Sequence, residues 1–439
     1  MRAKTFKGGV HLHYFKEATA SKSIEIMPEP ELVTLPVLQH LGAPAEVIVA
    51  VGDQVKAGQV IAQAKGFVSV PVHASIPGKV TAISELPHPN GRKVTMVVIE
   101  NDNSGANAFG PQSSLADLSA QQIRELMQQI GLVGMGGAGF PTHVKYQPVE
   151  GKKVESVILN GAECEPYLTC DHRLMVEVPG KVILGLQAMM KAAGVEQAFI
   201  GIEVNKPDAI EILTREAAVD PRIQVVPLEV KYPQGEEKML INAITRKTVP
   251  SGGLPIDVGV VVNNIATACA LAEAIQEGVP LIGRVVTVTG GVNNPRNLRV
   301  KLGVSVNKLV DYCNGFTGTP GRIILGGPMT GPAQYRLDLP VIKTTSGVLV
   351  QERGEIKLLE DSPCVRCARC VDACPYNLMP CFIANAIDIK DLALAEKYGI
   401  MDCRECGSCT FVCPGRRPIV QNIKTAKAKI ATAKKKGAI

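Results

Sequence analysis

A cysteine motif that occurs twice near the end of the 439-residue chain constrains the fold more than any other feature. In each copy three cysteines are spaced three residues apart, a fourth follows after four residues, and a proline comes next. The eight cysteines are Cys364, Cys367, Cys370, Cys374, Cys403, Cys406, Cys409 and Cys413. Nine of the thirteen cysteines lie in the last 76 residues, whereas a disulfide scaffold would spread them along the chain. The block therefore predicts a metal-binding module.

The spacing and the trailing prolines resemble two-cluster bacterial ferredoxins, in which the fourth cysteine of each run ligates the other cluster. This resemblance implies two [4Fe–4S] clusters with crossed ligands. Cluster one would use Cys364, Cys367, Cys370 and Cys413, and cluster two would use Cys403, Cys406, Cys409 and Cys374. A pair of zinc sites is the minor alternative, because Cys-x2-Cys is also zinc spacing, but a third cysteine and a proline have no use in a zinc ribbon.

The remaining cysteines lie outside this pattern. Cys381 falls between the two copies, and we expect it to be an ordinary packed thiol. Four isolated residues, Cys164, Cys170, Cys269 and Cys313, are interpreted in the same way.

Charge and hydropathy restrict where the chain can work. The net charge is +6, but the residues from Cys406 onward hold eight Lys or Arg and no acidic residue, which leaves the first 405 residues at −2. A terminal basic segment favours contact with an acidic partner or anionic lipid, and the scarcity of aromatic residues, with no Trp, argues against nucleic acid binding. We find no uninterrupted apolar run of membrane-spanning length and no secretory signal, and expect a cytoplasmic protein.

Hydrophobic periodicity divides the chain into units. Short β-rich runs between turns predict a barrel-sandwich over 32–101, after an N-terminal arm over 1–31. A polar linker precedes a helix that begins at Ser119 with a capping box to Gln122 and stops at Gly131. Alternating strands and helices predict an α/β layer unit over 115–275, and a small α+β unit with a helix capped by Ser305 follows over 283–350. The cysteine module spans 358–420 and a basic tail spans 421–439.

Four segments of the α/β unit carry groups that could hold a ligand. The loop 134–139 packs four glycines into six residues, so that backbone amides can approach an anion, with Lys145 as a countercharge. The segment 157–166 is a strand that opens into Asn160, Glu163 and Glu165. A Gly-Glu-Glu sequence starts the helix at 235–237, and two amides, Asn263 and Asn264, end a strand. Each signal alone is weak, since solvated turns explain it equally well.

In combination, these four segments resemble the 51-kDa-type flavin and NADH subunit of respiratory complex I. With the Phe6-Lys7-Gly8-Gly9 opening, the barrel-sandwich and the cysteine motifs, residues 5–420 resemble the C subunits of Rnf electron-transport complexes. The resemblance implies a multidomain α/β fold: a barrel-sandwich hybrid, an FMN/NADH domain, a soluble-ligand-binding β-grasp domain and a ferredoxin-like α domain. The β-grasp domain, with its Gly290-Gly291 and Gly326-Gly327 turns, is interpreted as a spacer.

The resemblance also assigns residues to non-covalent FMN and to NAD(H). Met135 and Ala162 depart from the complex I pattern, which has Arg and Asp there. Glycines would line the phosphates, Phe140 would stack on adenine, Glu165 would face the nicotinamide half, and the others would hold or enclose the flavin. The implied cofactor-binding residues are Gly134, Gly136, Gly137, Phe140, Lys145, Asn160, Glu163, Glu165, Gly235, Glu236, Glu237, Asn263 and Asn264. No side chain is assigned as a catalytic residue.

The function implied is that of a peripheral subunit, on the cytoplasmic face of the membrane, of an ion-translocating NAD:ferredoxin oxidoreductase. It would exchange hydride between NAD(H) and FMN and relay single electrons through two clusters to or from membrane-embedded and cluster-containing Rnf subunits, with ferredoxin as an indirect partner. The sequence does not choose the direction of flow or between Na⁺ and H⁺. Alternatives are a soluble microcompartment-type cobalamin reductase and a scaffold whose flavin site has decayed.

Overall fold

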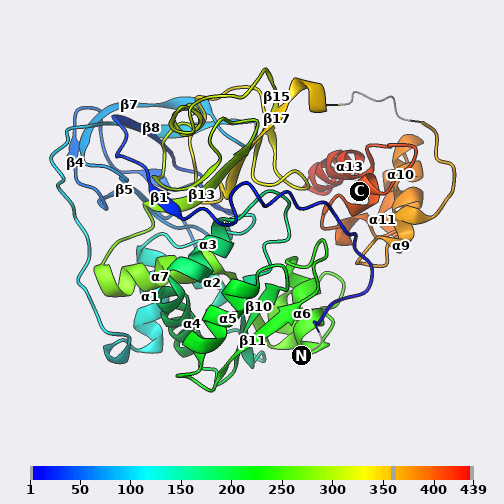
Figure 1. Ribbon diagram of the computed structural model, residues 1–439, viewed down its shortest axis with the longest axis horizontal. Coiled ribbons are helices and arrows are strands. Elements are labelled where there is room, and N and C mark those ends of the chain that lie inside the picture. The colour runs from blue at the N-terminus through cyan, green and yellow to red at the C-terminus, as the bar shows by residue number, and fades with distance from the viewer. Residues whose placement is uncertain (1–2, 357–361, 436–439) are drawn as a thin grey trace.

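The protein is described by a computed structural model that covers residues 3–356 and 362–435. The α/β unit lies along one side of the molecule, the barrel-sandwich and β-grasp units lie together along the other, and the cysteine module stands at one end (Figure 1). The first two residues of the predicted arm, the start of the cysteine module before residue 362 and the end of the tail after residue 435 lie outside the described residues.

Two small sheets form the barrel-sandwich unit. One has the order β2-β8-β7-β4 and the other β3-β5-β6, and all of their pairings are antiparallel. Val33, Leu35, Val97 and Ile99 are buried between them at alternate positions, because successive side chains of a strand point to opposite faces. The strands are β2 (Leu32–Pro36), β3 (Glu46–Val47), β4 (Gln54–Val55), β5 (Val60–Gln63), β6 (Val72–His73), β7 (Gly78–Pro87) and β8 (Lys93–Asn101).

A four-stranded parallel sheet, in the order β11-β10-β9-β12, is the centre of the α/β unit. Its strands are apolar on both faces, as expected for a sheet covered by helices on each side. Val157 and Leu159 belong to the core beneath α4 and α7, whereas Ile158 belongs to the core beneath α6. The elements are β9 (Ser156–Gly161), β10 (Ala198–Glu203), β11 (Ile223–Leu228), β12 (Val260–Asn264), α1 (Ala120–Gln129), α2 (Thr142–Lys145), α3 (Cys170–Glu177), α4 (Pro179–Ala193), α5 (Pro207–Ala217), α6 (Glu237–Thr245) and α7 (Ile265–Glu277).

The predicted helix starts agree with the structure in one case and differ in detail in another. Ser119 caps α1, and the reciprocal bonds of its capping box with Gln122 are both present. Ser305 lies at the N-cap of α8 (Val306–Tyr312), but its side chain makes no capping hydrogen bond. A suitable residue type therefore fixes the position of a helix start without guaranteeing the bond.

The β-grasp unit is built on a six-stranded mixed sheet, in the order β1-β14-β13-β17-β15-β16. Its first strand comes from the N-terminal arm and pairs in parallel with β14, so the arm completes a sheet whose other strands begin more than 250 residues later. The elements are β1 (Ile24–Ile26), β13 (Gly283–Gly290), β14 (Arg296–Lys301), α8 (Val306–Tyr312), β15 (Pro320–Leu325), β16 (Ala333–Gln334) and β17 (Gly347–Glu352).

The arm contacts three of the units in turn (Figure 1). Lys4 bridges to Leu228 on the α/β sheet, Val10 pairs with Tyr232, and the backbone N–H of Gly9 donates to the carbonyl oxygen of Ala373 in the cysteine module at 3.0 Å. A Cβ atom at Gly8, which has a φ of +84°, would lie 3.0 Å from the Cys374 carbonyl oxygen. The close approach of arm and module therefore depends on glycine.

Short helices form the cysteine module, and the predicted basic tail is part of it. The final helix α13 packs its buried face, Ile419, Ile423 and Ile430, into the module core against α10. The predicted start of the tail at 421 falls within this helix, and the Lys/Ala composition gave no sign of the apolar residues four and seven positions apart that pack on the module. The helices are α9 (Arg369–Asp372), α10 (Pro380–Asp388), α11 (Leu392–Lys397), α12 (Ser408–Phe411) and α13 (Ile419–Lys435). Within residues 3–356 and 362–435, no helix is long and apolar enough to cross a membrane.

Candidate functional site

The two cysteine motifs fold alike. Each has left-handed backbone at the second and fourth residues after its first cysteine: φ is 57° at Arg366 and 59° at Glu405, then 59° at Ala368 and 84° at Gly407. In each, the third cysteine lies on a single-turn helix, Cys370 on α9 and Cys409 on α12. The repeated spacing therefore produces repeated geometry, with the thiols of each motif wrapped around one side of a hollow.

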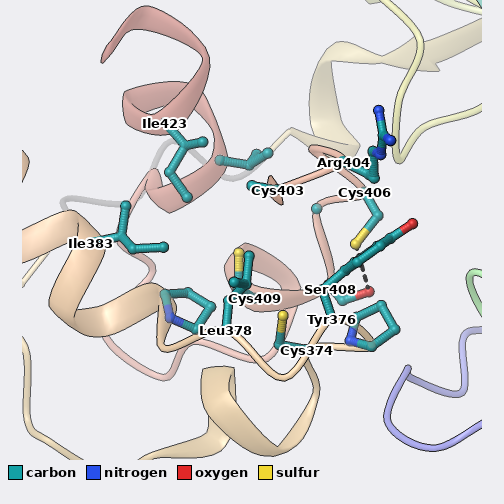
Figure 2. A pocket seen from close by; sticks show the side chains of 14 residues that line it. Cys374, Tyr376, Leu378, Ile383, Cys403, Arg404, Cys406, Ser408, Cys409 and Ile423 are labelled. Atoms are coloured by element: carbon teal, nitrogen blue, oxygen red, sulfur yellow. Dashed lines mark hydrogen bonds between the residues drawn. The ribbon is translucent and has the colours of Figure 1, made fainter. Parts of the chain in front are cut away.

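Each hollow takes its fourth thiol from the other motif. Cys374 lines the same hollow as Cys403, Cys406 and Cys409, and we name it the inner hollow. Figure 2 shows the thiols of Cys374, Cys406 and Cys409 facing one space, with Ile383 and Ile423 beside it. The outer hollow is lined by Cys364, Cys367, Cys370 and Cys413, and also by Cys381. This is the crossed arrangement that the ferredoxin-like spacing implies.

The separation of the thiols bears on the zinc alternative. A tetrahedral Zn²⁺ with Zn–S distances of about 2.3 Å brings its sulfurs to about 3.8 Å from one another. Among the described residues, which include all eight motif cysteines, no three of these thiols have sulfurs within 4.8 Å of one another. The donor set, four thiols around each hollow, fits a [4Fe–4S] cluster, and its spacing favours a group larger than one ion.

A cavity of about 710 Å³, much larger than either hollow, opens between the α/β unit, the β-grasp unit, the barrel-sandwich unit and the cysteine module. That volume is typical of cofactor sites. Eight of the thirteen residues assigned to FMN and NAD(H) line it: Gly136, Gly137, Asn160, Glu163, Glu165, Gly235, Glu236 and Asn264. The structure thus brings together residues that the sequence separates by more than a hundred positions.

The walls of this cavity are close-packed at the glycines. A Cβ at Gly136 would lie 2.7 Å from Nδ2 of Asn264, and one at Gly235 would lie 3.2 Å from Oδ1 of Asn160. Asn160 in turn donates from Nδ2 to the carbonyl oxygen of Gly235 at 2.7 Å. The backbone of two loops can therefore lie against a ligand there, which fits a flavin nucleotide.

Five assigned residues do not line the cavity: Gly134, Phe140, Lys145, Glu237 and Asn263. Lys145 Nζ donates to the Val262 carbonyl at 2.8 Å and lies 3.4 Å from Glu237, so its charge is paired within the protein. Asn263 donates to the hydroxyl of Tyr146 at 2.5 Å. Lys145 was expected as the countercharge of a phosphate, and in the structure its ammonium is held by Val262 and Glu237.

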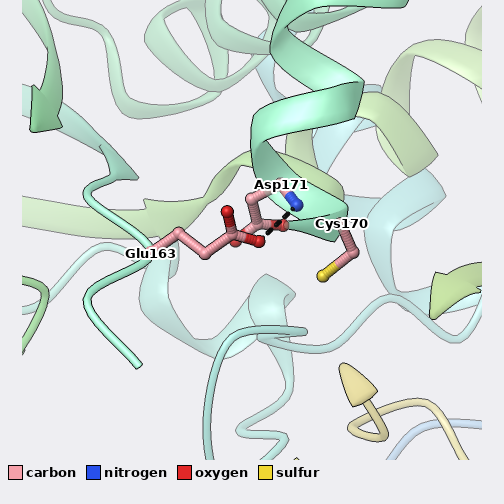
Figure 3. A group of neighbouring side chains, drawn as sticks. All are labelled: Glu163, Cys170 and Asp171. Atoms are coloured by element: carbon pink, nitrogen blue, oxygen red, sulfur yellow. Dashed lines mark hydrogen bonds between the residues drawn. The ribbon is translucent and has the colours of Figure 1, made fainter. Parts of the chain in front are cut away.

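A buried acidic group lies in the cavity wall at the start of α3. Glu163 accepts from the backbone N–H of Asp171 at 2.7 Å and of His172 at 3.2 Å, and Figure 3 shows its carboxylate against the first turn of the helix. Asp171 accepts from Asn264 Nδ2 at 2.6 Å. Burial raises the pKa of Asp171 to about 7, and the adjacent Glu163 carboxylate adds to the rise. The pair can hold a proton near neutral pH.

Glu165 joins the α/β unit to the β-grasp unit. Its carboxylate accepts from the backbone N–H of Met329 at 3.1 Å and from the hydroxyl of Thr330. Burial raises its pKa, and the bonds from Thr330 and Met329 oppose that rise. The β-grasp unit also lines the cavity at 325–327, 330–332 and 344–346. The spacer interpretation was wrong, since this unit forms a wall of the site.

Sequence reasoning missed one lysine beneath the carboxylate loop. The Lys16 ammonium, carried by the arm, donates to the carbonyl oxygens of Glu163 at 2.8 Å, Glu165 at 3.0 Å and Leu168. Burial lowers its pKa, and the Glu163 carboxylate opposes that shift. The sequence did not single out Lys16, because a basic residue in a polar arm belongs to no motif or hydrophobic pattern. Its role in fixing the loop of Glu163 and Glu165 depends on the arm lying across the α/β unit.

The cavity and the inner hollow adjoin each other at Cys406, which lines both. Tyr232, also in the cavity wall, donates from its hydroxyl to the carbonyl oxygen of Cys406 at 2.7 Å. Arg404 and Glu405 of the same motif face the cavity as well. A redox group in the cavity would thus lie beside the inner hollow, while none of the motif cysteines of the outer hollow lines the cavity.

Family models match four successive parts of the chain. They are described as an RnfC barrel sandwich hybrid domain over residues 4–104, a Nuo51 FMN-binding domain over 127–273, an SLBB domain over 285–333 and a 4Fe-4S dicluster domain over 356–414. These matches confirm the predicted fold class and support FMN and [4Fe–4S] clusters as cofactors.

One solved structure, the NAD⁺-reducing [NiFe]-hydrogenase in its air-oxidized state, contains a chain of similar fold. The TM-score is 0.52 at 20% identity, and the match covers 72% of this chain and 61% of the hydrogenase chain. The same hydrogenase in its H2-reduced state matches with a TM-score of 0.51 at 18% identity, covering 73% and 62%. At this level of identity the likeness concerns the fold.

Curated relatives match over almost the whole chain. The C subunit of the Na⁺-translocating ferredoxin:NAD⁺ oxidoreductase complex of Acetobacterium woodii is 46% identical over 99% of this chain and 98% of its own. The C subunit of the proton-translocating complex of Clostridium ljungdahlii is 46% identical over 97% and 94%, and that of the ion-translocating complex of Rhodobacter capsulatus is 41% identical over 98% and 84%. The chain therefore belongs to the family of C subunits of ion-translocating ferredoxin:NAD⁺ oxidoreductase complexes.

Proposed function

We propose that this chain is the subunit through which electrons pass between NAD(H) and the rest of an ion-translocating ferredoxin:NAD⁺ oxidoreductase. The observation that carries the proposal is the shared position of Cys406, in the wall of the 710 Å³ cavity and in the inner hollow. A flavin in that cavity would contact the loop that holds one ligand of cluster two. The geometry thus supports the order NAD(H), FMN, cluster two and cluster one, in either direction.

FMN supplies the chemistry that joins a two-electron donor to one-electron carriers. The chain would position it through Gly136, Gly137 and Asn264 on one side and Gly235 and Glu236 on the other, with Asn160 and Glu163 between them. Glu165 would face NAD(H) beside the β-grasp wall. We assign Gly134, Phe140, Lys145, Glu237 and Asn263 to the support of these loops, because they lie off the cavity wall.

The buried carboxyl groups would manage protons at this site. Glu163 is fixed by two backbone N–H groups of α3, so its oxygens have partners in the ionised form. Asp171 can hold a proton near neutral pH, on the carboxyl oxygen other than the one that accepts from Asn264. Lys16 keeps the loop between them in place by binding three carbonyl oxygens. The protein part of the reaction is positioning and proton storage.

The partners would be the other subunits of the complex, with ferredoxin reached indirectly. The outer hollow suits the exchange of electrons with a partner, because Cys367 is exposed and Val365 is 65% exposed beside it. Arg366 in the same loop and the basic helix α13 favour an acidic partner surface or anionic lipid. We place the chain at the cytoplasmic face of the membrane as a peripheral subunit, and divide it at 1–31, 32–101, 115–275, 283–350, 358–420 and 421–439 as predicted.

The test is anaerobic purification followed by rapid mixing with NADH. We expect bound FMN, about eight irons and eight sulfides per chain, bleaching of the flavin by NADH, and reduction of cluster two before cluster one. Zinc with little iron, or a bound flavin inert to both NADH and NADPH, would refute the proposal. A cobalamin reductase is not favoured, because the curated relatives are C subunits of oxidoreductase complexes over nearly their full length. A decayed scaffold is disfavoured by the intact cavity carboxylates.

A further inference from the structure

The outer hollow contains one thiol more than a [4Fe–4S] cluster needs. Cys364, Cys367, Cys370 and Cys413 line it, and Cys381 is the fifth cysteine in the same wall. Cys381 lies in the first turn of α10, half-buried against the module core. The inner hollow, by contrast, is lined by four cysteines. The difference sets the two otherwise repeated sites apart.

Cys381 is close to one ligand in particular. Cys381 and Cys370 line the same hollow, and Cys381 packs against the buried cluster of side chains that contains Cys370. Cys370 is 8% exposed on α9, and α9 packs against α10, which carries Cys381. The fifth thiol therefore lies next to a ligand position on a neighbouring helix rather than on the same loop.

A fifth thiol would be of most use in the outer hollow, because solvent reaches the cluster ligands there. Its second cysteine, Cys367, is exposed, whereas the equivalent cysteine of the inner hollow, Cys406, is only partly exposed. Water and protons compete with thiolates for iron, and that competition is strongest where solvent reaches the ligands.

We propose that Cys381 is a reserve ligand of cluster one, placed to bind the iron atom that Cys370 otherwise holds. The inference rests on the proposed function, since it requires a cluster in the outer hollow. In the exchange, the Cys381 thiol gives its proton to solvent and its sulfur binds iron, while the Cys370 sulfur leaves iron and takes up a proton. No electron moves, and the cluster keeps its four irons and four sulfides.

The test compares Cys370→Ala with the double variant Cys370→Ala/Cys381→Ala in the full chain, after anaerobic purification. Iron and sulfide analysis should give about eight irons for the unmodified chain and for Cys370→Ala, but about four for the double variant. Electron paramagnetic resonance of the reduced samples should show both clusters in Cys370→Ala and only cluster two in the double variant. Equal iron content and equal spectra in the single and double variants would overturn the inference.

A matched control comes from the inner hollow. Cys409→Ala should lower the iron content by the same amount with or without Cys381→Ala, because Cys381 does not line that hollow. A rescue of Cys409→Ala by Cys381 would contradict the specific pairing with Cys370. Little iron in the unmodified chain would refute the proposed function itself, and so the two failures can be told apart.

A second measurement covers the case in which Cys370→Ala does not fold. The unmodified chain and Cys381→Ala, both loaded with two clusters, are exposed to an iron chelator under anaerobic conditions. Four of the eight irons should leave Cys381→Ala several-fold faster than they leave the unmodified chain, and the other four at the same rate. Identical release curves would overturn the inference.

Discussion

The inner and outer hollows come from the same sequence motif, yet their surroundings differ. The inner hollow adjoins the large cavity through Cys406, and Tyr232 binds the backbone there. The outer hollow faces solvent at Cys367 and contains a fifth thiol. A repeated motif thus fixes the local geometry of the ligands, whereas the position of each copy in the fold decides which partner its cluster can serve.

The largest expected effect on this comparison comes from the variant Cys374→Ala. Cys374 belongs to the first motif but lies in the inner hollow, so we expect loss of cluster two and of about half the iron. Iron analysis and electron paramagnetic resonance should show cluster one intact. Loss of cluster one with retention of cluster two would show that the crossed arrangement is wrong.

The cavity beside the inner hollow should give the protein a pH dependence that the outer hollow does not. The pKa of Asp171 is about 7 in the folded protein against 3.8 in the unfolded chain, so the folded state binds more protons between these values. The free energy of unfolding should therefore fall as pH rises from about 4 to 7, by at most about 1.4 kcal/mol per pH unit, and level off above.

The measurement is the urea midpoint of the flavin signal from pH 5.5 to 8, in the unmodified chain and in Asp171→Asn. Asparagine keeps an oxygen that can accept from Asn264 but cannot titrate, and we expect its curve to be flatter over the acid half of the range. Parallel curves for the two proteins would exclude Asp171 as the group responsible.

A third prediction separates delivery of electrons from cluster assembly. Glu165→Gln should raise the KM for NADH roughly tenfold, because a neutral amide replaces the carboxylate that we assign to NAD(H). The loss of a charge-assisted hydrogen bond from that carboxylate costs about 1.5 kcal/mol or more. Both hollows should retain their iron, because Glu165 lines neither.

Glu237→Gln is the matched control for this prediction. Glu237 is a neighbouring carboxylate that pairs with Lys145 off the cavity wall, so its effect should be smaller. Steady-state kinetics with ferricyanide provides the comparison. Equal effects of the two variants would mean that the NADH site includes Glu237 as well as Glu165, and the placement of NADH at the cavity wall would be wrong.

The smallest expected effect comes from Tyr232→Phe. The variant removes the hydrogen bond from the Tyr232 hydroxyl to the Cys406 carbonyl oxygen. This should weaken the contact between the cavity wall and the cysteine module by about 1 kcal/mol. We expect a shift in the reduction potential of cluster two alone, measured by a potentiometric titration followed by electron paramagnetic resonance. Tyr398→Phe, at a ring that packs on Phe382 in the module, serves as the control. A shift of cluster one in Tyr232→Phe would contradict the assignment.

Local patterns predicted much of the molecule because their causes are local. The capping box of Ser119, the continuous apolar run of β9 and the cysteine spacing each reflect contacts within a few residues or a repeated motif. The resemblance placed eight residues on the cavity wall. Lys16 and the β-grasp wall were not predictable in this way, because their partners lie more than 140 positions away in the sequence. Phe140 was assigned to an adenine contact by analogy alone, and it does not line the cavity.

The path of the N-terminal arm has a consequence for the order of folding. Gly9 pairs with Ala373, and β1 adds to a sheet whose neighbouring strand begins at Arg296. The arm is synthesised before these partners, so it cannot reach its final position until the residues up to Ala373 have been made. Contacts of such high sequence separation form late and slowly, because a large loop must close before they gain any stabilisation. Until then, the loop that Lys16 binds and the backbone that Gly9 binds beside Cys374 lack these restraints, so the cofactor-binding segments reach their final geometry only after the arm has docked.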